Sequence, residues 1–65
     1  MRIVVNGASL EARAAALSEV LEELGYHDAV VSTAVNGEFV PVGVRGAITL
    51  HEGDRLEVLA PMQGG

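Results

Sequence analysis

The chain has 65 residues, enough for one domain and too few for two. A domain of this size buries only about 60% of its unfolded surface, so almost every buried position is needed for packing. The absence of cysteine excludes disulfides and thiolate metal sites. These limits weigh against a self-contained enzyme with a deep active site, and we expect the chain itself to bind no metal and no cofactor.

The net charge of −5 disfavours nucleic-acid binding, because an acidic surface repels phosphate backbones. The basic residues are all arginines, and they are scattered along the chain. Without lysine, copies of the chain cannot be joined to one another through lysine amines. The sequence also lacks the long apolar stretch of a signal peptide or a membrane span. We therefore expect a cytoplasmic protein whose partners include neither nucleic acid nor membrane.

The first strand is predicted from the β-branched run at residues 3–5, which stops at Asn6-Gly7. Asn-Gly is the strongest short-range hairpin signal, and a hairpin here needs a return strand at Ala8–Ala12. By propensity, however, the same alanine-rich stretch favours a helix with Ser9 as its N-cap. We follow the turn and predict a short strand, with residues 8–13 open to either structure.

An amphipathic helix is predicted from about Ala14. Its apolar stripe recurs at helical spacing, and glutamates lie on the opposite face. Gly25 is placed to end the helix. The members of the apolar stripe are Leu17, Val20, Leu21 and Leu24.

A second hairpin is predicted from the β-rich residues 29–35, the dipeptide Asn36-Gly37, and the strand Glu38-Phe39-Val40, which Pro41 ends. Residues 42–47 contain two glycines and are expected to be a connecting loop. A turn at residues 51–54 precedes a last strand, Arg55 to Leu59, in which polar and apolar residues alternate.

Two hairpins separated by one helix predict an α+β domain in which a mixed sheet wraps that helix, an arrangement called the β-grasp. The crossover through the helix makes the first and last strands parallel neighbours. We predict a β-grasp domain over residues 1–60 and a flexible C-terminal tail over residues 61–65, which leaves the sheet from a central strand.

Catalytic constellations are nearly absent from the sequence. His27 and His51 each lie beside acidic residues in a turn and are interpreted as solvated histidines. No serine has the context of a nucleophile elbow, and no glycine pattern opens a helix to cradle a phosphate.

The tail is the remaining candidate. Gly64 and Gly65 contribute no packing and are costly to order, so the simplest interpretation is a frayed end. The functional interpretation is that an end without Cβ atoms can thread a narrow channel into the active site of another protein. The carboxylate of Gly65 would be an anion at neutral pH, able to attack an activated phosphate.

The whole pattern resembles the ThiS family of sulfur carriers in thiamine biosynthesis. The resemblance is carried by residues 4–7, by the helix with Gly25, by the stretch from Ala34 to Pro41, by residues 52–58, and by the end Met62-Gln63-Gly64-Gly65. Residues 8–16 depart from the family pattern, since they are alanine-rich and about one residue short.

The resemblance implies that Gly65 is adenylated by a ThiF-like adenylyltransferase that uses ATP. The adenylate is then converted into a thiocarboxylate with sulfur from a persulfide donor, and the thiocarboxylate supplies sulfur to thiazole synthase. Gly64, which has no side chain, lets the end of the chain enter a narrow channel, while Met62 and Gln63 line the partner's channel. The carrier is then a co-substrate and not an enzyme.

A docking patch near the tail is predicted from Phe39, Val40 and Leu59, although adjacent Phe39 and Val40 point to opposite faces of a strand, so one of them can be a core residue. The alternatives are a carrier for molybdopterin synthesis, which shares the terminal Gly-Gly, and a ubiquitin-like protein modifier. A ligand- or RNA-binding β-grasp module is disfavoured by the acidic charge.

Overall fold

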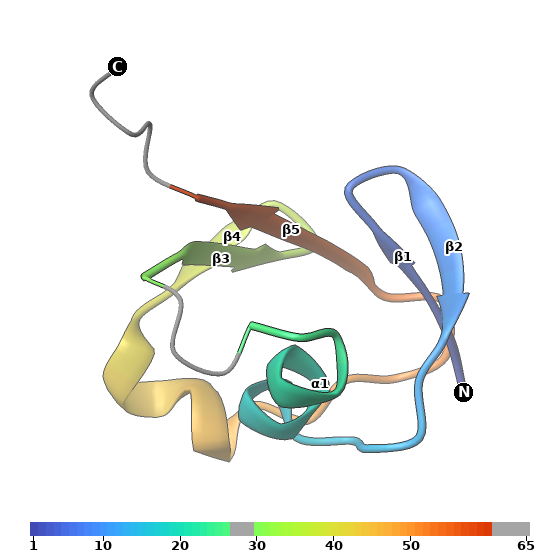
Figure 1. Ribbon diagram of the computed structural model, residues 1–65, viewed down its shortest axis with the longest axis horizontal. Helices are drawn as coiled ribbons and strands as arrows, with labels where there is room; N and C mark the ends of the chain where they lie inside the picture. The colour runs from blue at the N-terminus through green and yellow to red at the C-terminus, as the bar shows by residue number, and fades with distance from the viewer. Residues whose placement is uncertain (27–29, 61–65) are drawn as a thin grey trace.

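The computed structural model of the protein describes residues 1–26 and 30–60. Within them the chain forms one sheet, one α-helix and one 3-10 helix (Figure 1). The elements in chain order are β1 (Arg2–Val5), β2 (Ala8–Glu11), α1 (Leu17–Glu23), β3 (Ser32–Val35), β4 (Glu38–Val40), η1 (Val42–Ala47) and β5 (Arg55–Leu59).

The strands are arranged in the order β2-β1-β5-β3-β4, with α1 lying across one face of the sheet (Figure 1). β1 and β5 are parallel, and every other neighbouring pair is antiparallel. The crossover from β1 to β5 therefore makes the last strand a central one. The predicted mixed sheet on one helix, with parallel first and last strands, is confirmed.

Both predicted hairpins form, and each turns at an Asn-Gly dipeptide. Asn6 and Asn36 have φ angles of 50° and 51°, and the glycines that follow have φ of 86° and 87°. Positive φ at both central residues matches the right-handed twist of the flanking strands, and only Asn, Asp and Gly adopt it at low cost.

The first hairpin settles the ambiguity at residues 8–13: residues 8–11 form the strand β2, which ends one residue before the predicted Ala12, and residues 12 and 13 are neither strand nor helix. β2 pairs along its whole length with β1, from Arg2 opposite Glu11 to Val5 opposite Ala8. Ser9 is an exposed strand residue and not a helix cap. Tertiary pairing here overrides the helical propensity of the alanines.

The helix begins at Leu17, three residues later than the predicted start at Ala14. The backbone of the preceding segment is used elsewhere: the Leu50 amide donates to the Ala15 carbonyl at 2.8 Å, and the Leu17 amide donates to the Ile48 carbonyl at 2.9 Å. Ala16 also forms an isolated bridge with Thr49. An extended pairing of these residues with the segment before β5 excludes a helix until Leu17.

The side chain of Glu23, at the C-terminal end of α1, binds the backbone at the start of the segment that precedes the helix. Its carboxylate accepts hydrogen bonds from the amides of Arg13, at 2.9 and 3.1 Å, and of Ala14, at 3.1 Å. These bonds lower the pKa of Glu23, with the Ala14 amide as the largest cause. The helix ends as predicted, because Gly25 has a φ of 95° and its amide bonds the Glu22 carbonyl.

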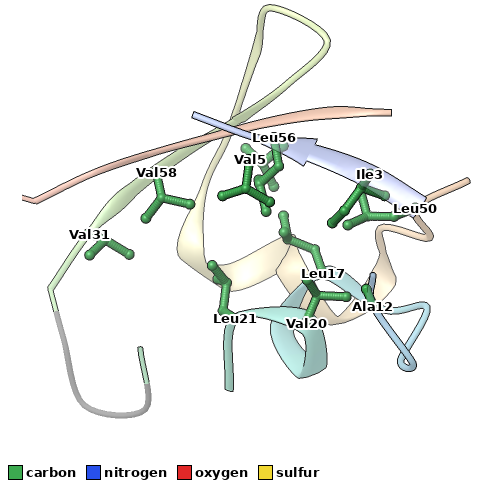
Figure 2. Close-up of a cluster of buried hydrophobic side chains, with 11 residues drawn as sticks. Ile3, Val5, Ala12, Leu17, Val20, Leu21, Val31, Leu50, Leu56 and Val58 are labelled. Carbon is green, nitrogen blue, oxygen red and sulfur yellow. The ribbon is translucent and has the colours of Figure 1, made fainter. Parts of the chain in front are cut away.

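The core lies between α1 and the sheet face that α1 covers (Figure 2). Leu17, Val20 and Leu21 of the predicted stripe are buried, while Leu24 is partly buried. The remaining buried apolar residues are Ile3, Val5, Ala12, Val31, Val40, Leu50, Leu56 and Val58.

Residues 42–47 form the 3-10 helix η1 and not the predicted irregular loop. Arg45 at its end reaches back to β3 and to the residue before it: its guanidinium donates to the Val31 carbonyl at 2.6 Å and to Thr33 Oγ1 at 3.1 Å. These bonds hold η1 against the sheet. The two glycines of residues 42–47 gave no indication of this contact. Among the described residues, no helix is long and apolar enough to cross a membrane.

The register of β5 can be tested with two leucines of opposite burial on the same strand. Leu56 is fully buried, whereas Leu59 is 67% exposed. We expect Leu56→Ala to lower the free energy of unfolding by about 2–5 kcal/mol, since it removes buried methyl groups and leaves a cavity. Leu59→Ala should change it by less than about 0.5 kcal/mol. Urea unfolding measures both, and equal losses would contradict this register.

Candidate functional site

The predicted site residues Met62, Gln63, Gly64 and Gly65 lie outside the described residues. The predicted boundary between a domain over 1–60 and a tail over 61–65 therefore stays a prediction. What the structure describes is the strand that leads to this tail, β5, together with the residue that follows it, Ala60.

β5 is held by strands on both sides. It pairs with β1 through Val4 opposite Arg55 and Val5 opposite Leu56. On its other side it pairs with β3 over a longer stretch that reaches Ser32 opposite Leu59. Its residues alternate between exposed and buried, so one face of the strand joins the core and the other is open.

The pairing with β1 is extended by a side chain. The Asn6 amide donates to the Leu56 carbonyl at 3.0 Å, after which the main chain of β1 turns away at Gly7. The side-chain amide of Asn6 then serves both backbone groups of Val58. Its Oδ1 accepts from the Val58 amide at 2.9 Å, and its Nδ2 donates to the Val58 carbonyl at 3.1 Å.

A second asparagine acts in the same way at the start of β5. Asn36 Oδ1 accepts from the Arg55 amide at 3.0 Å, and the Asn36 amide donates to the Arg55 carbonyl at 2.7 Å. Asn36 Nδ2 donates to Asp54 Oδ1 at 3.1 Å, and Asp54 Oδ2 accepts from the His51 amide at 2.8 Å. The bond from Asn36, followed by the bond from His51, lowers the pKa of Asp54.

The predicted docking patch is divided between the two faces of the sheet. Val40 is only 6% exposed, because it lies opposite buried Thr33 and faces the core, so its assignment to an exposed patch is wrong. Phe39 and Leu59 are each 67% exposed and belong to the face away from α1. Their role in docking stays a prediction.

Other chemistry-bearing groups are sparse in the described part of the chain. The His51 side chain is 78% exposed in the turn before β5, as expected for a solvated histidine, and its Nδ1 lies 3.8 Å from Asp54 Oδ2. His27 lies outside the described residues. Residues 1–26 and 30–60 contain no group of three or more His, Cys, Asp or Glu side chains placed to hold a metal ion.

The side-chain roles of Asn6 and Asn36 were not predicted from the sequence. The Asn-Gly pairs gave a signal for turns, and the turns are where these residues lie. That their amides also bind the central strand depends on the register of β5 against β1 and β3, which the sequence pattern leaves open.

Comparisons with known proteins agree on one family. The sequence profile of the ThiS family matches residues 2–65. The chain is 32% identical to the crystal structure of the thiamine biosynthesis protein ThiS from Geobacter metallireducens, with a TM-score of 0.82 and 100% of both chains covered. It is 30% identical to an NMR solution structure of a thiamine biosynthesis protein from that organism, with a TM-score of 0.80, covering 100% of this chain and 88% of the other. No curated protein matches.

The hydrogen bonds at the start of β5 predict a specific acid sensitivity. Because the pKa of Asp54 is lower in the folded protein than its ordinary value of 3.8, this carboxylate stabilises the fold above that value. The contribution is lost as the pH falls below 3.8 through the folded pKa. We therefore expect Asp54→Asn to show a smaller drop in Tm over this acid range than the wild type.

Thermal unfolding followed from neutral to acid pH measures this difference. A part of the wild-type drop should remain in Asp54→Asn, since the pKa of Glu23 is also lowered by its hydrogen bonds. The control Glu57→Gln, which removes an exposed carboxylate from β5, the strand that follows Asp54, should keep the full wild-type drop. An Asp54→Asn profile that coincides with the wild type would contradict the account.

Proposed function

This chain belongs to the ThiS family, and from that membership we propose that it is a sulfur carrier of thiamine biosynthesis whose working group is the carboxylate of Gly65. The observation that carries the proposal is that the family match runs through Gly65, and that the alignment with the Geobacter structure covers both chains in full. The Gly-Gly end is thus part of the similarity and not an addition to it.

The first step makes the carboxyl carbon reactive. A carboxylate is a poor electrophile, so an oxygen of Gly65 attacks the α-phosphorus of ATP on a ThiF-like adenylyltransferase, and pyrophosphate leaves. The product is an acyl-adenylate with AMP as a good leaving group. The ATP site belongs to the activating enzyme, and the carrier contributes only the carboxylate and a glycine end without Cβ atoms that fits a narrow channel.

The second step exchanges AMP for sulfur. The terminal sulfur of a persulfide attacks the acyl carbon, the C–O bond to AMP breaks, and an acyl disulfide forms. A thiol then reduces the S–S bond and releases the thiocarboxylate on Gly65. This group is a better nucleophile than the original carboxylate, so it can attack an electrophilic intermediate on thiazole synthase and leave its sulfur there. When the acyl C–S bond breaks, an oxygen from the acceptor or from water takes the place of the sulfur on the acyl carbon, and the carboxylate is restored.

The fold supports this role by offering a stable base close to the reactive end. Residues 61–65 separate Ala60 from the Gly65 carboxylate, and five residues span at most about 18 Å of extended chain. The strand from which this segment extends, β5, is central in the sheet and is paired on both sides. A partner that grips the domain therefore confines the carboxylate to a small volume, which raises its effective concentration.

The surface that a partner binds is proposed to be the face of the sheet away from α1, called the open face. Phe39 on β4 and Leu59 on β5 are exposed there, on strands separated by β3. Exposed apolar patches mark sites of interaction, and aromatic side chains are enriched at protein interfaces. Leu59 is also two residues from Pro61, which places the face close to the start of the tail.

The proposal is tested by the mass of the intact protein after incubation with the adenylyltransferase, ATP and a persulfide sulfur donor. The mass should increase by the difference between sulfur and oxygen. The increase should disappear when ATP is omitted or when Gly65 is deleted, since the reacting carboxylate is then missing or displaced. An increase that survives the deletion of Gly65 would exclude this carboxylate as the acceptor of sulfur.

The docking face is tested by the kinetics of adenylation. Removing an anchor that binds equally well before and during the reaction raises KM and leaves kcat unchanged. We expect Phe39→Ala to raise the KM for the carrier by roughly 5- to 30-fold, the range typical of a main contact residue. Val42→Ala is the control, since Val42 is 71% exposed but lies on η1. A similar KM for both variants would argue against this face.

A further inference from the structure

The main-chain ladder between β1 and β5 stops before β5 ends. On the β1 side the last main-chain pair is Val5 opposite Leu56, whereas on the β3 side pairing continues to Leu59. If main-chain hydrogen bonds were the sole contacts, the final residues of β5 would therefore be held only on the β3 side. They are also the residues that lead to the tail.

Asn6 fills this gap with a side chain. Its amide accepts from and donates to Val58, at 2.9 and 3.1 Å, in the place where the next peptide group of a longer β1 would stand. Both backbone groups of Val58 on that side are thereby satisfied. A primary amide is suited to this because it offers a donor and an acceptor in one plane, like the peptide group that it replaces.

We infer that Asn6 is a positioning residue for the tail carboxylate: by holding Val58 it fixes the point at which the chain leaves the sheet. The inference rests on the proposed function of Gly65. Without the side-chain amide, the end of β5 is held on the β3 side alone, so the arm predicted over residues 61–65 lengthens towards residue 58. A longer arm dilutes and disorients the carboxylate at the partner's active site.

The chain contains a matched control for this idea. Asn36 has the same φ, precedes a glycine in the same kind of turn, and binds the same strand through Arg55. It does so at the start of β5, far along the strand from the tail. Glycine at either position accepts the positive φ, so Asn6→Gly and Asn36→Gly keep both turns and each lose side-chain hydrogen bonds to the segment around β5.

The two variants are compared in adenylation by the ThiF-like enzyme, with thermal unfolding measured alongside. Asn6→Gly should lower kcat relative to Asn36→Gly, by up to about twofold through dilution, since release of all of residues 58–60 would lengthen the arm from five to eight residues, and by more through lost orientation. The KM for the carrier should stay at the wild-type value, because the docking face is untouched. Asn36→Gly should keep the wild-type kcat at a comparable loss of Tm.

Amide hydrogen exchange identifies the bond responsible. In Asn6→Gly the exchange rate should rise at Val58, whereas in Asn36→Gly it should rise at Arg55. Asn6→Asp is a second variant that tolerates the positive φ and keeps the acceptor for the Val58 amide, but it sets a carboxylate oxygen against the Val58 carbonyl in place of the donor, so its kcat should also fall below the wild-type value.

Equal kcat values in the two glycine variants, whether both lowered or both unchanged, would overturn the inference, as would unchanged exchange at Val58 in Asn6→Gly. These results differ from a failure of the proposed function. In that case the wild-type protein itself would not be adenylated.

Discussion

The structure depends on the hydrogen bonding of one strand. β5 is central in the sheet, so its backbone groups point to neighbours on both sides and each must find a partner. β1 and β3 are short and end in turns before β5 is fully paired. Asn6 and Asn36 complete the ladder at opposite ends of the strand. Each residue thus has two tasks, since it adopts the φ of its turn and pairs with β5.

The central position of β5 gives the sheet two faces with different roles. The face of β5 that carries Leu56 and Val58 packs on α1 and supplies much of the core. The opposite face carries Leu59 and, on β4, Phe39, and no element of the described chain covers these side chains. In a chain of 65 residues with no cysteine, the core face is committed to stability. The proposed recognition of partners is therefore assigned to the face away from α1 and to the tail.

Most of the fold could be predicted from local patterns. Asn-Gly pairs located both hairpins, and the alternation of Arg55 to Leu59 predicted the last strand with its observed bounds. The failures occurred where distant segments pair. The helix begins at Leu17 because Ala15 and Ala16 pair with residues 49 and 50, and η1 is held by Arg45 against Val31. No local signal in the alanine-rich or glycine-containing stretches reports those contacts.

Less of the candidate site than of the fold could be predicted from local patterns. The proposed role of Gly65 came from the resemblance of the whole chain, since a terminal Gly-Gly alone is as compatible with a frayed end. Val40 was placed in the docking patch as an apolar residue near the predicted tail, and only the pairing with β3 showed that it, and not adjacent Phe39, faces the core. The contact between Asn6 and Val58 required the register of strands that are 52 residues apart in sequence.

The central claim is that this chain supplies sulfur for the thiazole ring of thiamine through Gly65. It is tested most directly by the growth requirement of a strain from which the chain has been deleted. The account predicts growth only when thiamine or its thiazole precursor is added, with restoration by the full-length gene and not by a gene lacking the codon for Gly65. Growth of the deletion strain without either supplement, or restoration by the shortened gene, would contradict it.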